Sequence, residues 1–328
     1  MSLTGCTPDG KPLAFSRPPA PDLAPWVHSL AVADVLATEG RAEACAFFSE
    51  NAAIRVFLKG RWTLHTADGE RRYDTRDGSS ILYFGPQTKI MPLRVEGPFR
   101  FIQLQFRPGT EGKDPDLLPT HSLDRVFAFD DVIPTKDRGT YFSEDDSRER
   151  WIEIFEALAR RVLFGLVDEP PPPLVLDFER RMLTDQKLDL EAFAKSHGIS
   201  RRTFERAIAA AYGISPKAAL RRARVLDMAA ALLGVAMPEE EAKFRLRYFD
   251  QAHMTREIQA YFGMPPGKLQ RCDAHLLRID LEIRQMQRVA AMTALGLEDV
   301  PWRDDDMAID EQRHLRQLQD RDEPSITP

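Results

Sequence analysis

The pattern that decides the fold occurs twice in this chain. It is SRRTFERAIAAAYGISPKAALR at Ser200–Arg221 and DQAHMTREIQAYFGMPPGKLQR at Asp250–Arg271, fifty residues later. The matched positions are Phe204 and Met254, Arg206 and Arg256, Ile208 and Ile258, Tyr212 and Phe262, Gly213 and Gly263, and Pro216 and Pro266. Two copies are too few for a solenoid, which needs at least three stacked repeats. A small helical unit present twice instead indicates a pair of helix-turn-helix modules.

The first copy predicts a helix, a tight turn and a second helix. Ser200 can accept hydrogen bonds from the free backbone N–H groups at a helix start. The apolar residues that follow have the spacing that buries one helix face, and they are Phe204, Ile208, Ala211 and Tyr212. Gly213 suits the left-handed residue after a helix, and Pro216 suits the first position of the next one. Upstream, residues 188–194 predict a short amphipathic helix that completes a helix-turn-helix unit.

The second copy repeats this order after a long connecting helix. Asp250 is the expected cap, and a buried stripe follows it at Met254, Ile258, Tyr261 and Phe262. Residues 216–233 predict the connecting helix, which would hold the two modules at a fixed distance and angle. Its arginines, Arg221, Arg222 and Arg224, could contact phosphates, but we expect them to be solvated surface side chains.

Residues 175–271 resemble the AraC/XylS family of bacterial transcription regulators. The most specific stretch is Tyr248–Glu257, which holds a D-Q-x-H-x-x-R run and is followed by Gly263-Met264-Pro265-Pro266. The resemblance implies two helix-turn-helix modules that bind promoter DNA. Three features depart from the family pattern: Arg247 replaces a glycine, Glu239–Leu246 is unusually charged, and Leu269 replaces an aromatic residue. We therefore expect the second module to pack differently or to contact DNA more weakly than the first.

Ten residues at the second helices of the two modules, five in each module, are candidate DNA contacts. They are Ser200, Arg201, Arg202, Thr203 and Arg206 in the first module, and Gln251, Ala252, His253, Thr255 and Arg256 in the second. Arginine pairs with guanine in the major groove, and glutamine or histidine can also contact base edges. We expect Thr203, Thr255 and Arg256 to contact the DNA backbone and so to position the protein on the duplex. Two alternatives stay open: Arg256 could pair within its domain, and His253 could bind a phosphate.

The charge distribution agrees with this interpretation. The 328 residues carry a net charge of −6, yet residues 174–271 hold 17 Lys/Arg and 12 Asp/Glu, a net +5. Positive charge concentrated in one segment is the expected electrostatic footprint of a nucleic-acid-binding domain. The three cysteines are scattered and suggest no disulfide framework. Because the sequence has no long apolar run and no signal peptide, we expect a cytoplasmic, nucleoid-associated protein without membrane contact.

The first half of the chain predicts a β-domain. Short apolar or alternating runs broken by turn residues favour a β-sandwich or small barrel, and the predicted strands are 27–35, 44–49, 54–58, 62–66, 80–84 and 99–106. Ala67-Asp68-Gly69-Glu70 predicts a hairpin turn. Residues 1–24 are expected to be mobile. Residues 146–167 predict a helix that packs on the β-domain or, alternatively, mediates dimerisation.

The domain boundaries follow from composition. Residues 25–169 form the predicted β-domain, and the prolines at 170–173 form a semi-rigid spacer. Residues 174–271 form the DNA-binding domain. Residues 272–328 predict an amphipathic helix over 275–289, which could cover that domain or join a dimer, and then a disordered acidic tail.

The resemblance extends more weakly to the N-terminal domain. In AraC-like regulators this position often holds a cupin-like β-barrel that binds an effector or mediates dimerisation, and Phe84–Thr88 with Phe106–Gly109 look similar to that kind of domain. His28, His65 and His121 are too dispersed for a cupin metal site, so no metal or cofactor is expected. Trp62, Tyr83 and Phe101 are expected to be core residues.

The sequence therefore predicts an α+β multidomain protein, with a cupin-like β-barrel or sandwich and an all-α domain of two helix-turn-helix modules. Its predicted function is sequence-specific transcriptional regulation. Expected partners are double-stranded DNA, a small-molecule effector, a second copy of the chain and, for an activator, RNA polymerase. The alternative is a ligand-sensor or protein-interaction module that has lost DNA binding through changes at Lys243 and Arg247. An enzyme is not expected, because the sequence shows no nucleophile–base pairing, metal spacing or phosphate loop.

Overall fold

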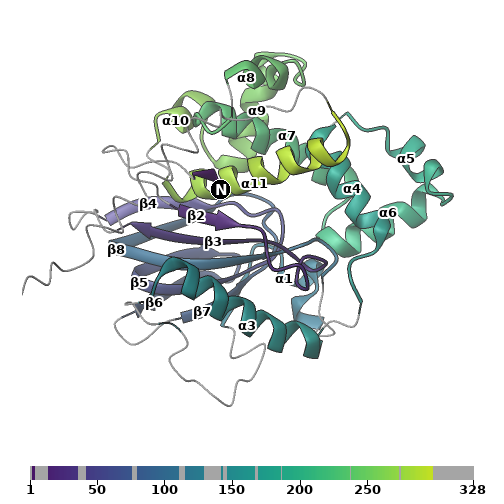
Figure 1. The fold of residues 1–328 in the computed structure, drawn as a ribbon. Helices are drawn as coiled ribbons and strands as arrows, with labels where there is room; N and C mark the ends of the chain where they lie inside the picture. The colour runs from purple at the N-terminus through teal and green to yellow at the C-terminus, as the bar shows by residue number, and fades with distance from the viewer. Residues whose placement is uncertain are drawn as a thin grey trace, which may run out of the picture.

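The computed structural model describes residues 2–3, 14–35, 42–75, 80–110, 115–128, 142, 146–166, 169–185, 187–236, 238–272 and 275–297. An N-terminal antiparallel sheet domain lies against a C-terminal helical region (Figure 1). This arrangement confirms the α+β fold class expected from the sequence. Within the described ranges, no helix has the length and apolar character needed to cross a membrane.

Nine strands form one sheet in the described part of the chain. They are β1 (Ser2–Leu3), β2 (Ala14–Arg17), β3 (Val27–Val35), β4 (Ala42–Phe47), β5 (Ala53–Thr66), β6 (Gly69–Asp74), β7 (Ser80–Phe84), β8 (Met91–Phe106) and β9 (Val126–Ala128). The long strands β5 and β8 pair with each other and organise the sheet, because β8 also pairs with β3 and β4, and β5 with β6 and β7. The predicted strands 54–58 and 62–66 are parts of β5, which continues through register shifts near Lys59.

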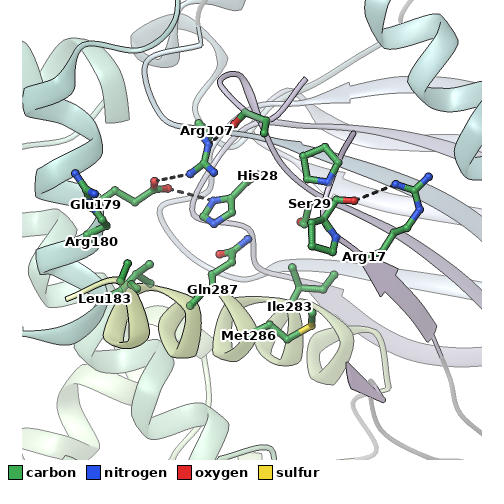
Figure 2. A pocket seen from close by; sticks show the side chains of 16 residues that line it. Arg17, His28, Ser29, Arg107, Glu179, Arg180, Leu183, Ile283, Met286 and Gln287 are labelled. Carbon is green, nitrogen blue, oxygen red and sulfur yellow. Dashed lines mark hydrogen bonds and ion pairs between the residues drawn. The ribbon is translucent and has the colours of Figure 1, made fainter. Parts of the chain in front are cut away.

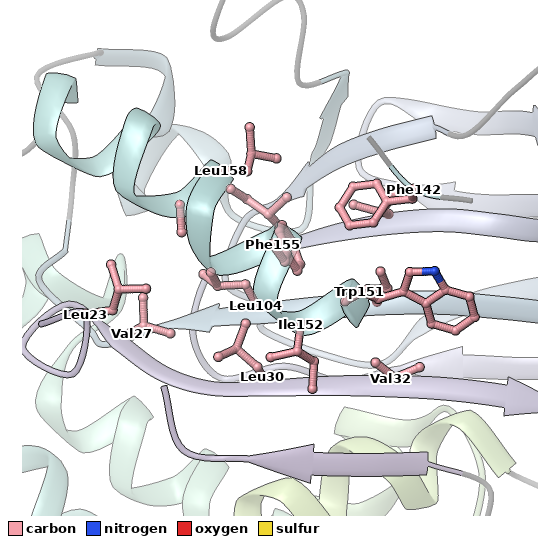
Figure 3. Packing of buried hydrophobic residues seen from close by; sticks show 14 of the residues in the cluster. Leu23, Val27, Leu30, Val32, Leu104, Phe142, Trp151, Ile152, Phe155 and Leu158 are labelled. Carbon is pink, nitrogen blue, oxygen red and sulfur yellow. The ribbon is translucent and has the colours of Figure 1, made fainter. Parts of the chain in front are cut away.

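The two faces of the sheet have separate cores. One face packs against α3 (Arg148–Leu166), which buries Trp151, Ile152 and Phe155 against β3 and β8 (Figure 3). The helix expected over 146–167 therefore packs on the sheet. The opposite face carries a cluster of aromatic rings that includes Trp62 and Phe101. Both side chains are buried, as expected of core residues.

Seven helices of the C-terminal region build two further cores within the described residues. They are α4 (Pro173–Thr184), α5 (Leu190–Ser196), α6 (Arg201–Tyr212), α7 (Pro216–Leu232), α8 (Pro238–Arg245), α9 (Gln251–Phe262) and α10 (Pro266–Gln270). The first core joins α4, α5 and α6 to the start of α7. The second joins the rest of α7 to α8, α9 and α10. Helix α7 thus connects the two modules by belonging to both cores.

Helix α11 (His275–Ala294) lies between the sheet and the helical region (Figure 1). Leu276, Ile279 and Ile283 belong to the aromatic core of the sheet. Leu277 and Leu281 belong to the core of the second module. This helix therefore packs against both domains of its own chain, which makes it a structural part of the domain junction.

The N-terminal segment differs from the sequence expectation. Residues 1–24 were expected to be mobile, but Ala14–Arg17 pairs with β3 and Leu23 is buried. The reason is a tertiary contact. The Ser16 hydroxyl lies 3.2 Å from the Met286 sulfur of α11, and the local sequence does not reveal this neighbour. Helix α4 begins at Pro173, so the last proline of the expected spacer is helical. Residues 4–13 and the expected acidic tail at 298–328 lie outside the described residues.

Candidate nucleic-acid interface

The first module has the cap and turn geometry of a helix-turn-helix unit. The Asp189 carboxylate caps α5 by accepting from Glu191 N and Ala192 N, at 2.9 and 3.1 Å. The Ser200 hydroxyl caps α6 by accepting from Thr203 N at 3.1 Å. Gly213 ends α6 in the left-handed conformation, with φ of 69°. Ser200 and Gly213 therefore have the structural roles that were predicted for them, whereas the cap at Asp189 was not predicted.

The second module repeats this geometry. The Asp250 carboxylate caps α9 by accepting from His253 N at 2.6 Å. Gly263 ends α9 with φ of 68°, and Pro266 starts α10. Met254, Ile258 and Phe262 form the buried stripe. The same grouping of cap, stripe and glycine gives α6 and α9 matched boundaries.

The ten candidate DNA contacts fall into two groups by exposure. Ser200, Arg202, Thr203, Arg206, Gln251, Ala252 and Arg256 are exposed, whereas Arg201, His253 and Thr255 are partly buried. Arg206 and Arg256 occupy equivalent positions in the repeat. Within the described residues, neither of these two arginines has an ion pair. Their guanidinium groups are therefore available to an external anion or base.

Two candidates have partners inside the domain. Arg201 Nε donates to Glu205 Oε1 at 2.7 Å on the surface of α6. His253 Nδ1 accepts from Phe249 N at 3.3 Å, which places the remaining ring proton on Nε2. Nε2 lies 3.3 Å from a carboxylate oxygen of Glu257. A base contact by Arg201 or His253 would have to compete with these internal interactions.

Of the connecting-helix arginines, Arg222 is buried and Arg224 is partly buried, contrary to expectation, whereas Arg221 is exposed as expected. Arg222 is fully buried and donates to the backbone oxygens of Gln87 and Glu50, at 2.8 and 2.9 Å. Arg221 and Arg224 bind the buried Glu257 carboxylate of α9, with their closest contacts at 2.7 and 2.9 Å. These arginines therefore position the recognition helix and the domain junction.

Two of the positions at which the second module departs from the family pattern, Arg247 and the charged helix α8, interact with residues elsewhere in the fold. Arg247, in the turn before α9, donates to the buried carboxylate of Asp227 at 2.6 Å and lies over the Phe244 ring. Glu240, in the charged helix α8, accepts from Gln285 at 2.8 Å and is paired with Arg288. Gln285 and Arg288 are both on α11. The second module is therefore completed by a helix outside the repeat.

The same helix carries a buried ionic junction. Arg284 of α11 binds Asp227 of α7 and donates from Nε to Glu50 of the sheet domain at 2.5 Å. Asp280 accepts from Arg55 at 3.0 Å and from Phe48 N at 2.9 Å. Burial by itself would raise the pKa of Asp227, but nearby guanidinium groups, Arg284 first, hold it below its usual value. Burial raises the pKa of Asp280 in spite of Arg55.

The sheet domain contacts the C-terminal ends of both recognition helices. At α6, the short helix α1 (Pro119–Ser122) lies so close to Gly213 that an added Cβ would be 2.8 Å from the Pro119 oxygen. At α9, Ile90 N donates to the Tyr261 oxygen at 2.9 Å. The Phe48 and Phe262 rings meet edge to face, with centroids 5.4 Å apart. Both recognition helices are thus anchored at the ends opposite their candidate DNA contacts.

Comparisons with known proteins found one family match and several similar solved structures. Residues 193–271 match the family model described as "Helix-turn-helix domain", while no curated protein matches the chain. ToxT from Vibrio cholerae is similar in structure, with 6% identity and a TM-score of 0.44 over 74% of this chain and 98% of ToxT. The C-terminal domain of the response regulator AraT from Geobacillus stearothermophilus shows 24% identity and a TM-score of 0.27 over 30% of this chain and 85% of that one.

A further similar structure is the AraC-like transcriptional activator CuxR, with 14% identity and a TM-score of 0.25 over 67% of this chain and 88% of that chain.

The family match covers both modules of the sequence repeat, from within α5 to the end of α10. It coincides with the two capped recognition helices and their exposed arginines. Residues 193–271 are therefore an AraC-type helix-turn-helix domain, and the chain is a DNA-binding transcription regulator.

Proposed function

We propose that the chain binds a bipartite DNA site by inserting α6 and α9 into two successive major grooves on one side of the duplex. The observation that carries the proposal is the pair Arg206 and Arg256, which are exposed at equivalent positions of two helices with matched boundaries. Successive major grooves on one face of B-DNA are about 34 Å apart. One chain would therefore bind an asymmetric site, and a homodimer would bind two.

The ten candidate residues have graded roles in this proposal. Arg202, Arg206, Gln251 and Arg256 are the main base or backbone contacts, because they are exposed on the recognition helices. Ser200, Thr203, Ala252 and Thr255 position the DNA backbone near the helix starts. Arg201 and His253 contribute after exchanging their contacts with Glu205 and Glu257.

The sheet domain is proposed to control the DNA-binding domain, either by binding an effector or by dimerising. Support comes from its contacts with Gly213 and Tyr261, at the ends of both recognition helices. A movement of the sheet domain would change the angle between α6 and α9. Promoter DNA and, for an activator, RNA polymerase are the partners that this function implies.

Selection of binding sites from random DNA tests the proposal. The full chain should enrich a bipartite motif whose halves lie about one helical turn apart. Arg206→Ala should relax one half, and Arg256→Ala should relax the other. Arg150→Ala, an exposed arginine on α3, is the matched control and should leave the motif unchanged. A single half-site in the selection by the unmodified chain would overturn two-groove binding.

One observation favours a second candidate function. Leu246 and Phe249, in the turn before α9, are 78% and 93% exposed, which is unusual for large apolar side chains. They suit a protein contact better than a DNA contact. If no DNA motif is enriched, and if Phe249→Ser abolishes binding to a defined protein partner, the chain is a protein-interaction module.

A further inference from the structure

The face of the sheet that meets α11 is filled by the protein's own side chains. The rings of Phe57 and Trp62 stack with their centroids 4.2 Å apart, and Phe99 and Phe101 lie edge-on to Trp62. Leu276, Ile279 and Ile283 of α11 close this core. That face therefore leaves no room for a ligand, but the described residues form a cavity beside the C-terminal half of the same helix.

This cavity has a volume of about 340 Å³ and lies where three parts of the protein meet. The sheet domain contributes His28 and Arg107, α4 contributes Arg180, and α11 contributes Met286 and Ala290. Figure 2 shows Arg107 and His28 directed toward Glu179 of α4, while the side chains of α11 form the opposite wall. The volume is in the lower range of small-molecule sites.

The polar side of the cavity has more positive than negative charge. Its lining includes three arginines, Arg17, Arg107 and Arg180, and one carboxylate, Glu179. Arg17 is neutralised by Glu156 outside the cavity, at 2.9 Å. The Glu179 carboxylate is shared among His28, Arg107 and Asn51.

The remaining capacity to bind an anion lies with two of these arginines. Arg107 lies 3.4 Å from Glu179, and Arg180 is half exposed and 3.8 Å from Asp177 of its own helix. Arg107 Nε also donates to the Ala24 oxygen at 2.8 Å, so the Nη groups of Arg107 and Arg180 keep the N–H donors that can be directed into the cavity.

The opposite wall is mostly apolar, and its polar residue Gln287 donates to Gln105 at 2.7 Å. The apolar part of this wall is formed by Leu183 of α4 and by five residues of α11: Ile283, Met286, Ala290, Ala291 and Ala294. Ala290 and Ala294 are four residues apart, so their small side chains leave a continuous strip of space along one helix face. A ligand that satisfies both walls has an anionic end and an apolar body.

We propose that this cavity binds a small amphipathic organic anion, with a carboxylate or phosphate group at Arg107 and Arg180 and an apolar body along α11. The ligand would contact the sheet domain, α4 and α11 at once, so its binding would stabilise their junction. Because α11 also completes the second module, occupancy changes DNA binding. This last step rests on the proposed DNA-binding function, whereas anion binding does not.

Isothermal titration calorimetry of the full chain tests the site with decanoate, decyl phosphate and decanol. We expect both anions to bind with one ligand per chain and decanol to bind at least about tenfold more weakly, because it cannot pair with a guanidinium group. A preference for decanoate or for decyl phosphate identifies the anionic group. Decanol binding as tight as that of both anions, or no binding by either anion, would overturn the proposal.

Two pairs of variants locate the binding. Ala290→Phe fills the apolar strip and should abolish binding, whereas Thr293→Phe, an exposed position on the same helix, should not. Arg180→Ala should weaken anion binding about tenfold, and the neighbouring exposed Arg181→Ala should leave it unchanged. Binding that survives Ala290→Phe would place the ligand elsewhere and so refute this site.

A DNA titration separates the regulatory step from the site. Saturating decanoate should change DNA affinity by about fivefold or more in the unmodified chain and not in Ala290→Phe. Unchanged affinity in the unmodified chain would refute the regulation but leave the measured site. A chain that binds the anion and no DNA would instead contradict the proposed function, so the failures are distinguishable.

Discussion

The two helix-turn-helix modules share a sequence pattern but differ in what completes them. The first module closes its own core with α4, Phe178 of that helix lying among the rings of Phe193, Phe204 and Tyr212. The second module draws on α11, which supplies apolar residues to its core and Arg288 to its charged helix. The two modules therefore share a local sequence pattern, but the first is nearly self-contained and the second depends on α11, which lies outside the repeat.

The largest expected effect comes from removing α11. A chain ending at Cys272 loses Leu277 and Leu281 from the second module and Leu276, Ile279 and Ile283 from the sheet core. We expect hydrogen exchange to become fast in α8 and α9 while α5 and α6 remain protected. A chain ending at Leu297 is the control and should keep the original protection. Equal loss of protection in both modules would show that they do not differ in their dependence on α11.

The second effect concerns the buried carboxylate that joins the second module to α11. Asp227→Asn removes the buried carboxylate that Arg284 and Arg247 share and leaves Arg284 with Glu50 alone, so we expect a loss of about 3–5 kcal/mol in unfolding free energy. Urea unfolding monitored by hydrogen exchange in α7 measures it. Glu205→Gln in the first module removes a surface partner of Arg201, and we expect it to cost less than about 1 kcal/mol.

The stabilisation by Asp227 should also depend on pH. Its pKa is lowered in the folded protein, so its contribution is fully present above the unfolded-state value of about 3.9. The contribution is lost as the pH falls from that value through the lowered pKa. The stability difference between the unmodified chain and Asp227→Asn should therefore shrink in acid. A difference that stays constant from neutral pH down to strong acid would argue against the ion pair as its source.

The third effect compares the two matched arginines. Arg206→Ala and Arg256→Ala should each weaken binding to a selected site, by about 1–3 kcal/mol if the arginine contacts a base. The loss for Arg256→Ala should be smaller if the second module binds DNA more weakly, as the sequence suggests. Fluorescence anisotropy at constant salt measures both. No loss for Arg256→Ala would confine recognition to the first module.

The smallest effect compares the two helix-ending glycines. Gly263→Ala should lower the free energy of unfolding by about 1 kcal/mol, because alanine is strained at positive φ. No further loss is expected there, since the added Cβ meets no neighbouring atom within 4 Å. Gly213→Ala should cost more, because its Cβ would approach the Pro119 oxygen. Thermal unfolding of the two variants gives the comparison. Equal losses would mean that α1 does not restrain the end of α6.

The local features of both modules could be predicted because they depend on neighbouring residues. Ser200 and Asp250 cap helices through backbone groups three residues away, and Gly213 and Gly263 provide the left-handed conformation that ends them. The exposed positions of Arg206 and Arg256 follow from helical spacing. The buried role of Asp227 was missed, although a lone carboxylate in the apolar run Val225–Ala230 is a usable signal for a buried ion pair.

The sequence by itself determined the duplicated helix-turn-helix pattern, because caps, stripes and stops act over a few residues. Tertiary structure decided that α11 lies between the domains and that Arg222 is buried, because these depend on contacts between residues far apart in the chain. Whether a charged side chain faces solvent is set by what packs against it: the arginines of α7 meet Glu257 and the sheet domain. Local sequence spacing contains no information about those partners.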